Sequence, residues 1–165
     1  MKIKIKNDTS GKAIFSECEK YRYSLTREWD SSKEKILFLL LNPSTADAEH
    51  DDPTIRRCTN YAKLWGYGGL YIGNIFAFRA TEPTVMRKQS DPIGPLNNGF
   101  ILMLHKQAAI TVAGWGSNGS FLNREAYIKR LLKSNIYYLK LTKDGHPGHP
   151  LYLKKDLKPI KYGEE

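Results

Sequence analysis

The sequence predicts a single α/β domain, residues 1–165, built as a three-layer sandwich in which helices cover both faces of a mainly parallel four-stranded central sheet. Two apolar runs carry this prediction: ILFLLL at residues 36–41 and LYIGNIF at residues 70–76. Neither run alternates with polar residues, which is typical of strands buried on both faces in a parallel sheet. Between them, residues 53–65 repeat apolar side chains at helical spacing. Strand, helix and strand therefore form one parallel unit at the centre of the sheet.

Local signals predict the remaining elements. The central helix has Asp52 as its N-cap, Pro53 at its first position and Gly66 beyond its end. Further helices are predicted at residues 97–107 and 123–133, and further strands at residues 108–115 and 136–142. The first 29 residues mix β-branched, aromatic and charged side chains, so we expect edge strands and turns there.

Composition favours a polyanionic partner. The chain has 26 lysines and arginines against 17 aspartates and glutamates, a formal net charge of +9, and such basic surfaces favour nucleic acid. The two cysteines form no CxxC pair, which argues against zinc ribbons and iron–sulfur clusters, so we expect neither metal nor cofactor. No apolar run approaches the length of about 18 residues that a membrane span needs, and no signal peptide is visible. We expect a cytoplasmic monomer without membrane contact.

Candidate site residues follow the ends of the predicted strands. Because the carboxyl ends of parallel strands meet at one edge of a sheet, we expect these residues to line one pocket. They are Asn42, Pro43, Ser44, Thr45, Asp47, Asp51, Asp52 and Arg56 after the first strand, Asn74 and Arg79 after the second, Trp115 and Gly116 after the third, and His146 and His149 after the fourth.

Three of these segments together resemble the uracil-DNA glycosylase superfamily. The segments are LLLNPST, YIGNIFAFRATEP and GHPGHPLYL, and they stand in the order in which that superfamily has a G-x-N-P or G-Q-D-P loop, a strand-end asparagine and an H-P-S-P-L loop. Leu40 occupies the place of the superfamily's glycine. The whole chain is also similar to a small uncharacterised family of bacterial and phage proteins marked by LNPSTAD, DDPTIRRC, GNIFAFRAT, DPIGP, AGWG and GHPxHPLYL.

The resemblance implies a uracil-DNA-glycosylase-like fold and hydrolysis of the N-glycosidic bond of a base, modified or unmodified, in DNA. In that interpretation Asn42 orients water, with Asp47 or Asp51 as the alternative, and either His146 or His149 stabilises the departing base. Asn74 would read a base edge, and Tyr61, Trp65 or Trp115 would stack on the base. The other residues of the strand-end loops would bind the substrate.

Two alternative functions fit the same residues. The first is a metal-dependent nucleotide or phosphoryl hydrolase, whose magnesium or manganese ligands would come from the acidic stretch Asp47, Glu49, His50, Asp51 and Asp52. The second is a non-catalytic module that binds nucleic acid or a modified base in the same pocket. A base-release assay with and without metal separates the first alternative from the glycosylase, because only the metal-dependent hydrolase should require added metal.

Overall fold

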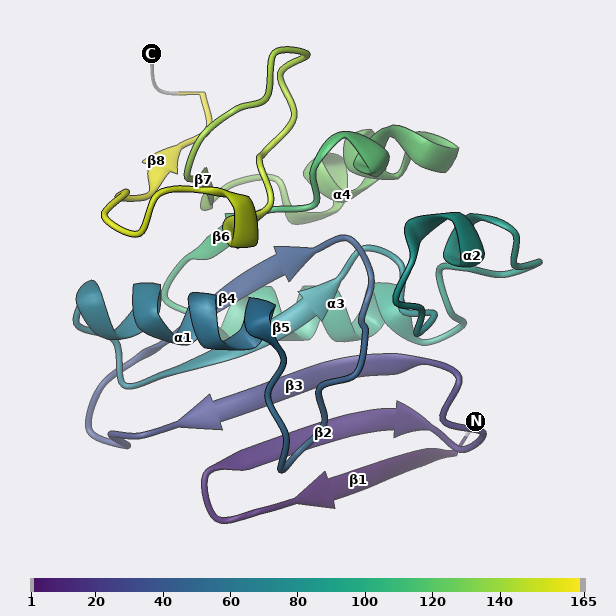
Figure 1. Cartoon of the computed structure of the whole chain (residues 1–165), viewed down its shortest axis with the longest axis horizontal. Helices are drawn as coiled ribbons and strands as arrows, with labels where there is room; N and C mark the ends of the chain where they lie inside the picture. The colour runs from purple at the N-terminus through teal and green to yellow at the C-terminus, as the bar shows by residue number, and fades with distance from the viewer. Residues whose placement is uncertain (1, 164–165) are drawn as a thin grey trace.

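A computed structural model describes residues 2–163 of the chain and confirms the α/β class (Figure 1). In these residues eight strands form one mixed sheet in the order β1-β2-β3-β5-β4-β6-β7-β8. The strands are β1 (Ile3–Asn7), β2 (Gly11–Ser16), β3 (Arg22–Glu28), β4 (Lys35–Leu40), β5 (Gly69–Asn74), β6 (Thr111–Ala113), β7 (Ile136–Tyr138) and β8 (Ile160–Lys161). The two long apolar runs, β4 and β5, lie at the centre of this order, as their burial pattern predicts.

The central pairings are parallel and the outer ones antiparallel. Strand β4 pairs in parallel with β5, with Ile36 opposite Leu70, and with β6, with Phe38 opposite Val112. Strand β7 continues the parallel part beside β6, and β8 then pairs antiparallel with β7. Strand β4 therefore has hydrogen-bonded neighbours on both sides.

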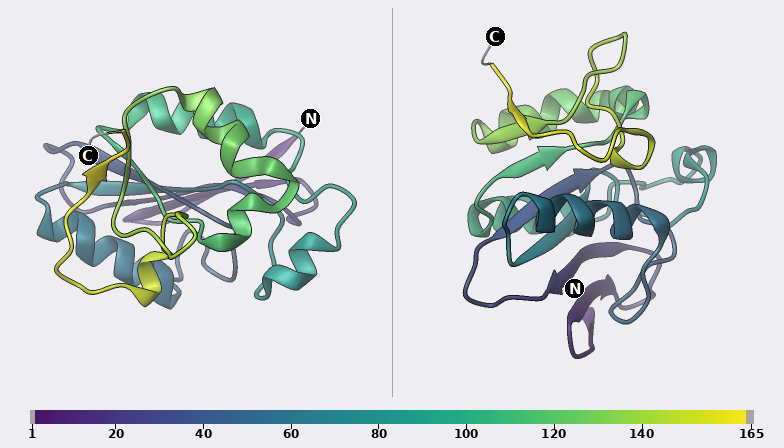
Figure 2. Two further views of the ribbon diagram at one scale, coloured as in Figure 1. Left: turned by 90° about the horizontal axis from the view of Figure 1, so that it is seen from above. Right: turned by 60° about the vertical axis from the view of Figure 1, so that its left-hand side comes forward.

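Helices cover both faces of the sheet (Figure 2). Helix α1 (Pro53–Leu64) packs on one face, where Ile55, Cys58 and Tyr61 join Phe38 and Ile72 in one core. Helices α3 (Asn97–Gln107) and α4 (Arg124–Leu132) cover the other face, and Ile101 and Ile128 contribute to its core with Leu39 and Ala113. Adjacent residues of β4 thus point into opposite cores, which explains the absence of polar alternation.

The sheet of the described residues has eight strands, more than the four that were predicted. The N-terminal strands β1, β2 and β3 form an antiparallel meander, and β3 joins the central sheet by pairing with β5, with Leu25 opposite Ile72. The sequence shows that these segments are strands, yet their junction with β5 depends on a contact between residues about fifty positions apart. Strand β8 was also not expected, because two residues give no periodic pattern.

Strands β6 and β7 are shorter than predicted, because after each strand the chain packs against the loop that carries His149. After β6 the chain turns away at Gly114, whose added Cβ would lie 2.7 Å from Pro150 Cδ. After β7, the backbone of Lys140 accepts a hydrogen bond from Gly148 N at 2.7 Å, and Thr142 N donates to His146 O at 2.7 Å. Residues 139–142 therefore pair with their own loop.

Helix boundaries are closer to expectation. Asp52 caps α1 by accepting a hydrogen bond from Ile55 N at 2.9 Å, as predicted. Helix α4 begins at Arg124, one residue later than predicted, and the short helices α2 (Pro83–Arg87), η1 (Ser117–Asn123) and η2 (Pro150–Tyr152) were not expected. No helix in residues 2–163 has the length and apolar character needed to cross a membrane.

The loop between β4 and α1 is anchored on the N-terminal meander (Figure 1). The buried Arg22 donates from Nη1 to Ala46 O at 2.8 Å, and Arg27 donates from Nη2 to Asp47 O at 2.6 Å and to His50 O at 3.2 Å. The carboxylate of Asp51 accepts from Arg27 Nε at 2.9 Å. The meander therefore holds the backbone of a loop that the sequence shows only as an acidic stretch.

The packing of β4 yields a stability prediction. Phe38 is fully buried, so Phe38→Ala should lower the free energy of unfolding by about 3–5 kcal/mol, as cavity-forming aromatic deletions do. Leu64 on α1 is 63% exposed, and Leu64→Ala should change it by no more than about 0.5 kcal/mol. Urea denaturation of both variants measures this difference. Equal losses in the two variants would contradict the assignment of Phe38 to the core.

Candidate functional site

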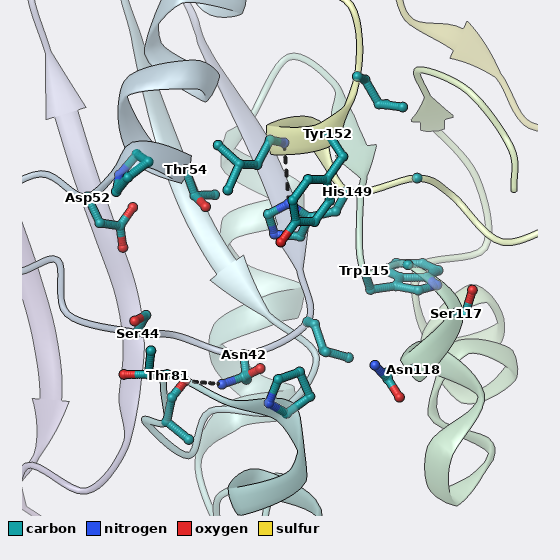
Figure 3. A pocket seen from close by; sticks show the side chains of 18 of the residues that line it. Asn42, Ser44, Asp52, Thr54, Thr81, Trp115, Ser117, Asn118, His149 and Tyr152 are labelled. Atoms are coloured by element: carbon teal, nitrogen blue, oxygen red, sulfur yellow. Dashed lines mark hydrogen bonds between the residues drawn. The ribbon is translucent and has the colours of Figure 1, made fainter.

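A cavity of about 780 Å³ opens at the carboxyl ends of the parallel strands. Loops after all four of these strands contribute to its wall (Figure 3). The lining residues are Leu41, Asn42, Ser44, Thr45, Asp52, Pro53 and Thr54 after β4, Ala80, Thr81 and Pro83 after β5, Trp115, Gly116, Ser117 and Asn118 after β6, and Thr142, Gly148, His149, Leu151, Tyr152 and Leu153 after β7. Seven of the fourteen predicted site residues are among them: Asn42, Ser44, Thr45, Asp52, Trp115, Gly116 and His149.

Asn42 presents an acceptor to the cavity. Its Nδ2 donates to Ala80 O at 2.8 Å and to Pro43 O at 3.2 Å, so both amide hydrogens are directed at backbone carbonyls. Since the loop after β5 supplies Ala80, the orientation of the Asn42 amide depends on two strand-end loops. Its Oδ1 has no hydrogen-bond partner within the described chain. This oxygen can accept a hydrogen bond from water or from a ligand.

His149 presents a donor on the other side of the cavity (Figure 3). Leu151 N donates to His149 Nδ1 at 3.3 Å, which places the proton of the neutral ring on Nε2. Burial lowers the pKa of His149 below its ordinary value of 6.5, and the Asp52 carboxylate acts in the opposite direction with a smaller effect. The neutral Nε2–H tautomer is therefore the form expected near neutral pH.

The loop that carries His149 is fixed from three sides. Pro147 O accepts from Gly116 N at 2.7 Å, and Gly114 approaches the Pro150 ring as described above. On the third side, α1 donates to the following segment: Arg57 Nη1 bonds Leu153 O at 2.5 Å. Tyr61 Oη and Trp65 Nε1 continue this row by donating to Lys154 O and Leu157 O. The position of His149 is thus fixed by contacts of its loop with the turn after β6 and with α1.

Two aromatic side chains border the cavity in different environments. Trp115 is 1% exposed, and the backbone of Gly119 packs against the edge of its indole ring. Tyr152 is 83% exposed, and its ring lies 5.6 Å from the His149 ring at an angle of 46°. Trp115 therefore forms a rigid wall, while Tyr152 offers an accessible face for stacking.

The second candidate histidine lies outside the lining. His146 Nδ1 is 2.6 Å from Glu125 Oε2 on α4, and His146 N donates to Thr142 Oγ1 at 3.1 Å. Its ring is thus engaged in holding the loop against α4. Glu125 also pairs with Lys129 at 3.2 Å.

The other predicted residues outside the lining have structural partners. Asp47 Oδ1 accepts from Glu49 N and His50 N at 3.0 and 2.7 Å, and Arg56 Nη1 donates to Asp51 O at 3.4 Å. Arg79 donates to Glu19 O at 3.1 Å and lies over the Phe15 ring. Pro43 O accepts from Ala80 N at 2.9 Å, Asp51 pairs with Arg27, and Asn74 is 2% exposed within β5. The expectation that Asn74 shares the pocket is therefore wrong.

The acidic stretch does not assemble a metal-binding group. Asp47 turns toward His50, Asp51 pairs with Arg27 and Asp52 caps α1. No three His, Cys, Asp or Glu side chains within residues 2–163 come together in an arrangement that could hold a metal ion. Asp52 is the carboxylate of this stretch that lines the cavity.

Several residues that line the cavity were not among the predicted site residues. Thr54, Thr81, Ser117 and Asn118 add polar groups, and Tyr152 adds an aromatic ring. Tyr152 stands in the quoted GHPGHPLYL segment and could have been found there. Asn118 follows the glycine-rich turn AGWGSNG, which signals a strand-to-helix connection without identifying a site residue.

The protein thus combines an α/β fold with a cavity at the carboxyl edge of the parallel strands of a mixed sheet. Residues 22–151 match the family described as "Protein of unknown function (DUF1643)", and the chain belongs to this family. No curated protein and no solved structure matches the chain.

The half-buried imidazole of His149 yields a prediction about pH. An unfolded chain protonates His149 near pH 6.5, and the folded protein does so at a lower pH, so protonation of the unfolded state opposes folding as the pH falls. Between about pH 7 and about pH 5, wild type should therefore lose more unfolding free energy than His149→Gln, which does not titrate. Urea denaturation at both pH values measures this difference. Identical losses would show that His149 is not held neutral.

Proposed function

We propose that this protein hydrolyses the N-glycosidic bond of a base in DNA. The observation that carries the proposal is the pairing, in one cavity, of a free acceptor on Asn42 with a free donor on His149. The cavity volume of about 780 Å³ lies in the range of small-molecule sites and accommodates a base with its sugar. The face of Tyr152 is available for stacking on a base that has left the helix.

The proposed reaction needs both groups. As the bond between C1′ and the base breaks, its electron pair moves to the base and positive charge develops on the sugar. A water held by Asn42 Oδ1 adds to C1′, and its proton ends on the departing base. The Nε2–H of His149 donates to the acceptor beside the bond, O2 of a pyrimidine or N3 of a purine, where negative charge develops. An asparagine amide is a poor base, so the proposal assigns most of the rate to charge stabilisation by His149.

The geometry also supports a choice between residues that the sequence left open. Of the two histidines in GHPGHP, His149 lines the cavity, while His146 pairs with Glu125. Asn42 lines the cavity, while Asp47 lies outside it. The proposal therefore assigns the leaving-group role to His149 and the water-orienting role to Asn42. The similarity to the uracil-DNA glycosylase superfamily, through NPST and HPGHPLYL, is consistent with these assignments.

DNA is the proposed substrate because of charge. The chain carries a formal net charge of +9, and two arginines bond directly to lining residues: Arg57 to Leu153 O and Arg87 to Asn118. We expect affinity for a short duplex and for a single strand to fall steeply between low and physiological salt, through release of counterions. Fluorescence anisotropy at two ionic strengths measures this change. Absence of binding at low salt would favour a free nucleotide as the substrate.

Base release is the direct test of the reaction. We expect wild-type protein to release a base from at least one DNA in a panel that carries uracil, hypoxanthine or bulky modified pyrimidines, without added metal. His149→Ala should lower turnover by about 10²–10³-fold, the typical effect of one placed donor, with little change in DNA affinity. Mass analysis of released bases gives the rates.

Matched variants complete this experiment. His50→Ala removes a histidine whose side chain is 71% exposed outside the cavity, so turnover should stay within twofold or so of wild type. Asn42→Asp should retain activity, because a carboxylate also orients water, whereas Asn42→Ala should not.

If wild type releases no base from any DNA, with or without metal, the proposal of N-glycosidic bond hydrolysis fails and a base-binding module replaces it.

A further inference from the structure

Asn118 has a fixed amide orientation at the cavity wall. Arg87 Nη1 donates to Asn118 Oδ1 at 2.9 Å, and a guanidinium can only donate, so the amide oxygen must face Arg87. The amide nitrogen is then directed toward the cavity, as Figure 3 shows. Asn118 therefore offers a donor, and Arg87 prevents the amide from turning to offer its oxygen instead.

The two ends of the cavity differ in polarity. Asn118 lies with Trp115 and Ser117 at one end, while Asp52, Ser44 and Thr54 lie at the other (Figure 3). Asn42 and His149 lie between the two ends. A ligand that spans the cavity therefore meets an amide donor at one end and a carboxylate at the other.

This polarity orients a nucleoside. If the glycosidic bond lies between Asn42 and His149, the sugar hydroxyls suit the Asp52 end, because a carboxylate accepts their hydrogen bonds. The base then extends toward Asn118. The acceptor beside the glycosidic nitrogen, O2 of a pyrimidine or N3 of a purine, stays near His149. The group that reaches Asn118 is then at the far edge of the base, position 4 of a pyrimidine or position 6 of a purine.

We infer that Asn118, held by Arg87, reads the far edge of the base and selects bases that carry an oxo group there over bases that carry an amino group. Uracil and hypoxanthine present an acceptor at this edge, and cytosine and adenine present a donor. This inference rests on the proposed function, which supplies the position of the glycosidic bond. It gives Asn118 the role that the sequence suggested for Asn74, which lies outside the cavity.

Binding of matched oligonucleotides tests the inference. The probes are short single strands with one variable nucleotide, uracil against cytosine and hypoxanthine against adenine, and a 2′-fluoro group that slows cleavage. Wild type should bind the oxo member of each pair about three- to tenfold more tightly, the contribution of one hydrogen bond. Asn118→Ala should remove this preference. Arg87→Met should reduce it, because the released amide can present either atom.

The control is Lys88→Met, which removes the exposed cation directly after α2 and should keep the preference while lowering affinity for all four probes equally. Equal binding of both members by wild type, a preference that survives in Asn118→Ala, or no binding of any probe would overturn the inference. If the preference disappears in Asn118→Ala but wild type releases no base, base selection by Asn118 is supported and hydrolysis of the N-glycosidic bond is rejected. If wild type releases a base but binds both members of each pair equally, hydrolysis is supported and base selection by Asn118 is rejected.

Discussion

The pairing of β4 on both sides is the constraint on which the site depends. Because β5 and β6 run parallel to β4, the chain leaves all three strands at one edge. The hydrogen bonds continue beyond the strands: Leu40 O accepts from Ile75 N, and Leu39 O accepts from Gly114 N, each at 2.9 Å. Ala80 N then donates to Pro43 O, so the loops after β4 and β5 remain side by side up to the residue that orients Asn42.

Electrostatics explains how an acidic loop is held against a basic protein. Arg22 is 2% exposed, and burial lowers its pKa to about 10, with Asp52 as the strongest opposing influence. Arg27 bonds both to the Asp51 carboxylate and to backbone carbonyls of the same loop. Charge pairing and carbonyl acceptance together fix the loop, and this leaves Asp52 at the cavity wall.

Local patterns predicted the parts of the fold that depend on local interactions. Helix α1 with its Asp52 cap, helix α3, and the burial of β4 and β5 follow from periodicity, capping residues and unbroken apolar runs. The shared edge of Asn42 and His149 follows from the parallel order of strands. The number of strands in the sheet was underestimated because β3 pairs with β5, and no sequence pattern in either segment predicts this pairing.

Contacts between distant residues explain what the sequence did not predict about the site. His146 and His149 look equivalent in GHPGHP, but His146 contacts Glu125, 21 positions away, while His149 lines the cavity. Asn118 acquires its orientation from Arg87, 31 positions away. Asn74 ends a strand, as expected, but it is 2% exposed and does not line the cavity. Chain order alone does not say which way a strand-end residue points.

The row of donors on α1 has a consequence for variation of the chain. Arg57 and Tyr61 of α1 and Trp65, its C-cap residue, are spaced four residues apart and donate to backbone carbonyls of the segment after His149. A carbonyl is present whatever side chain its residue carries. Residues 154–156 are exposed, so their charge can change while this anchorage is retained. The electrostatic character of the surface beside the cavity can thus diverge between relatives that keep His149 in the same place.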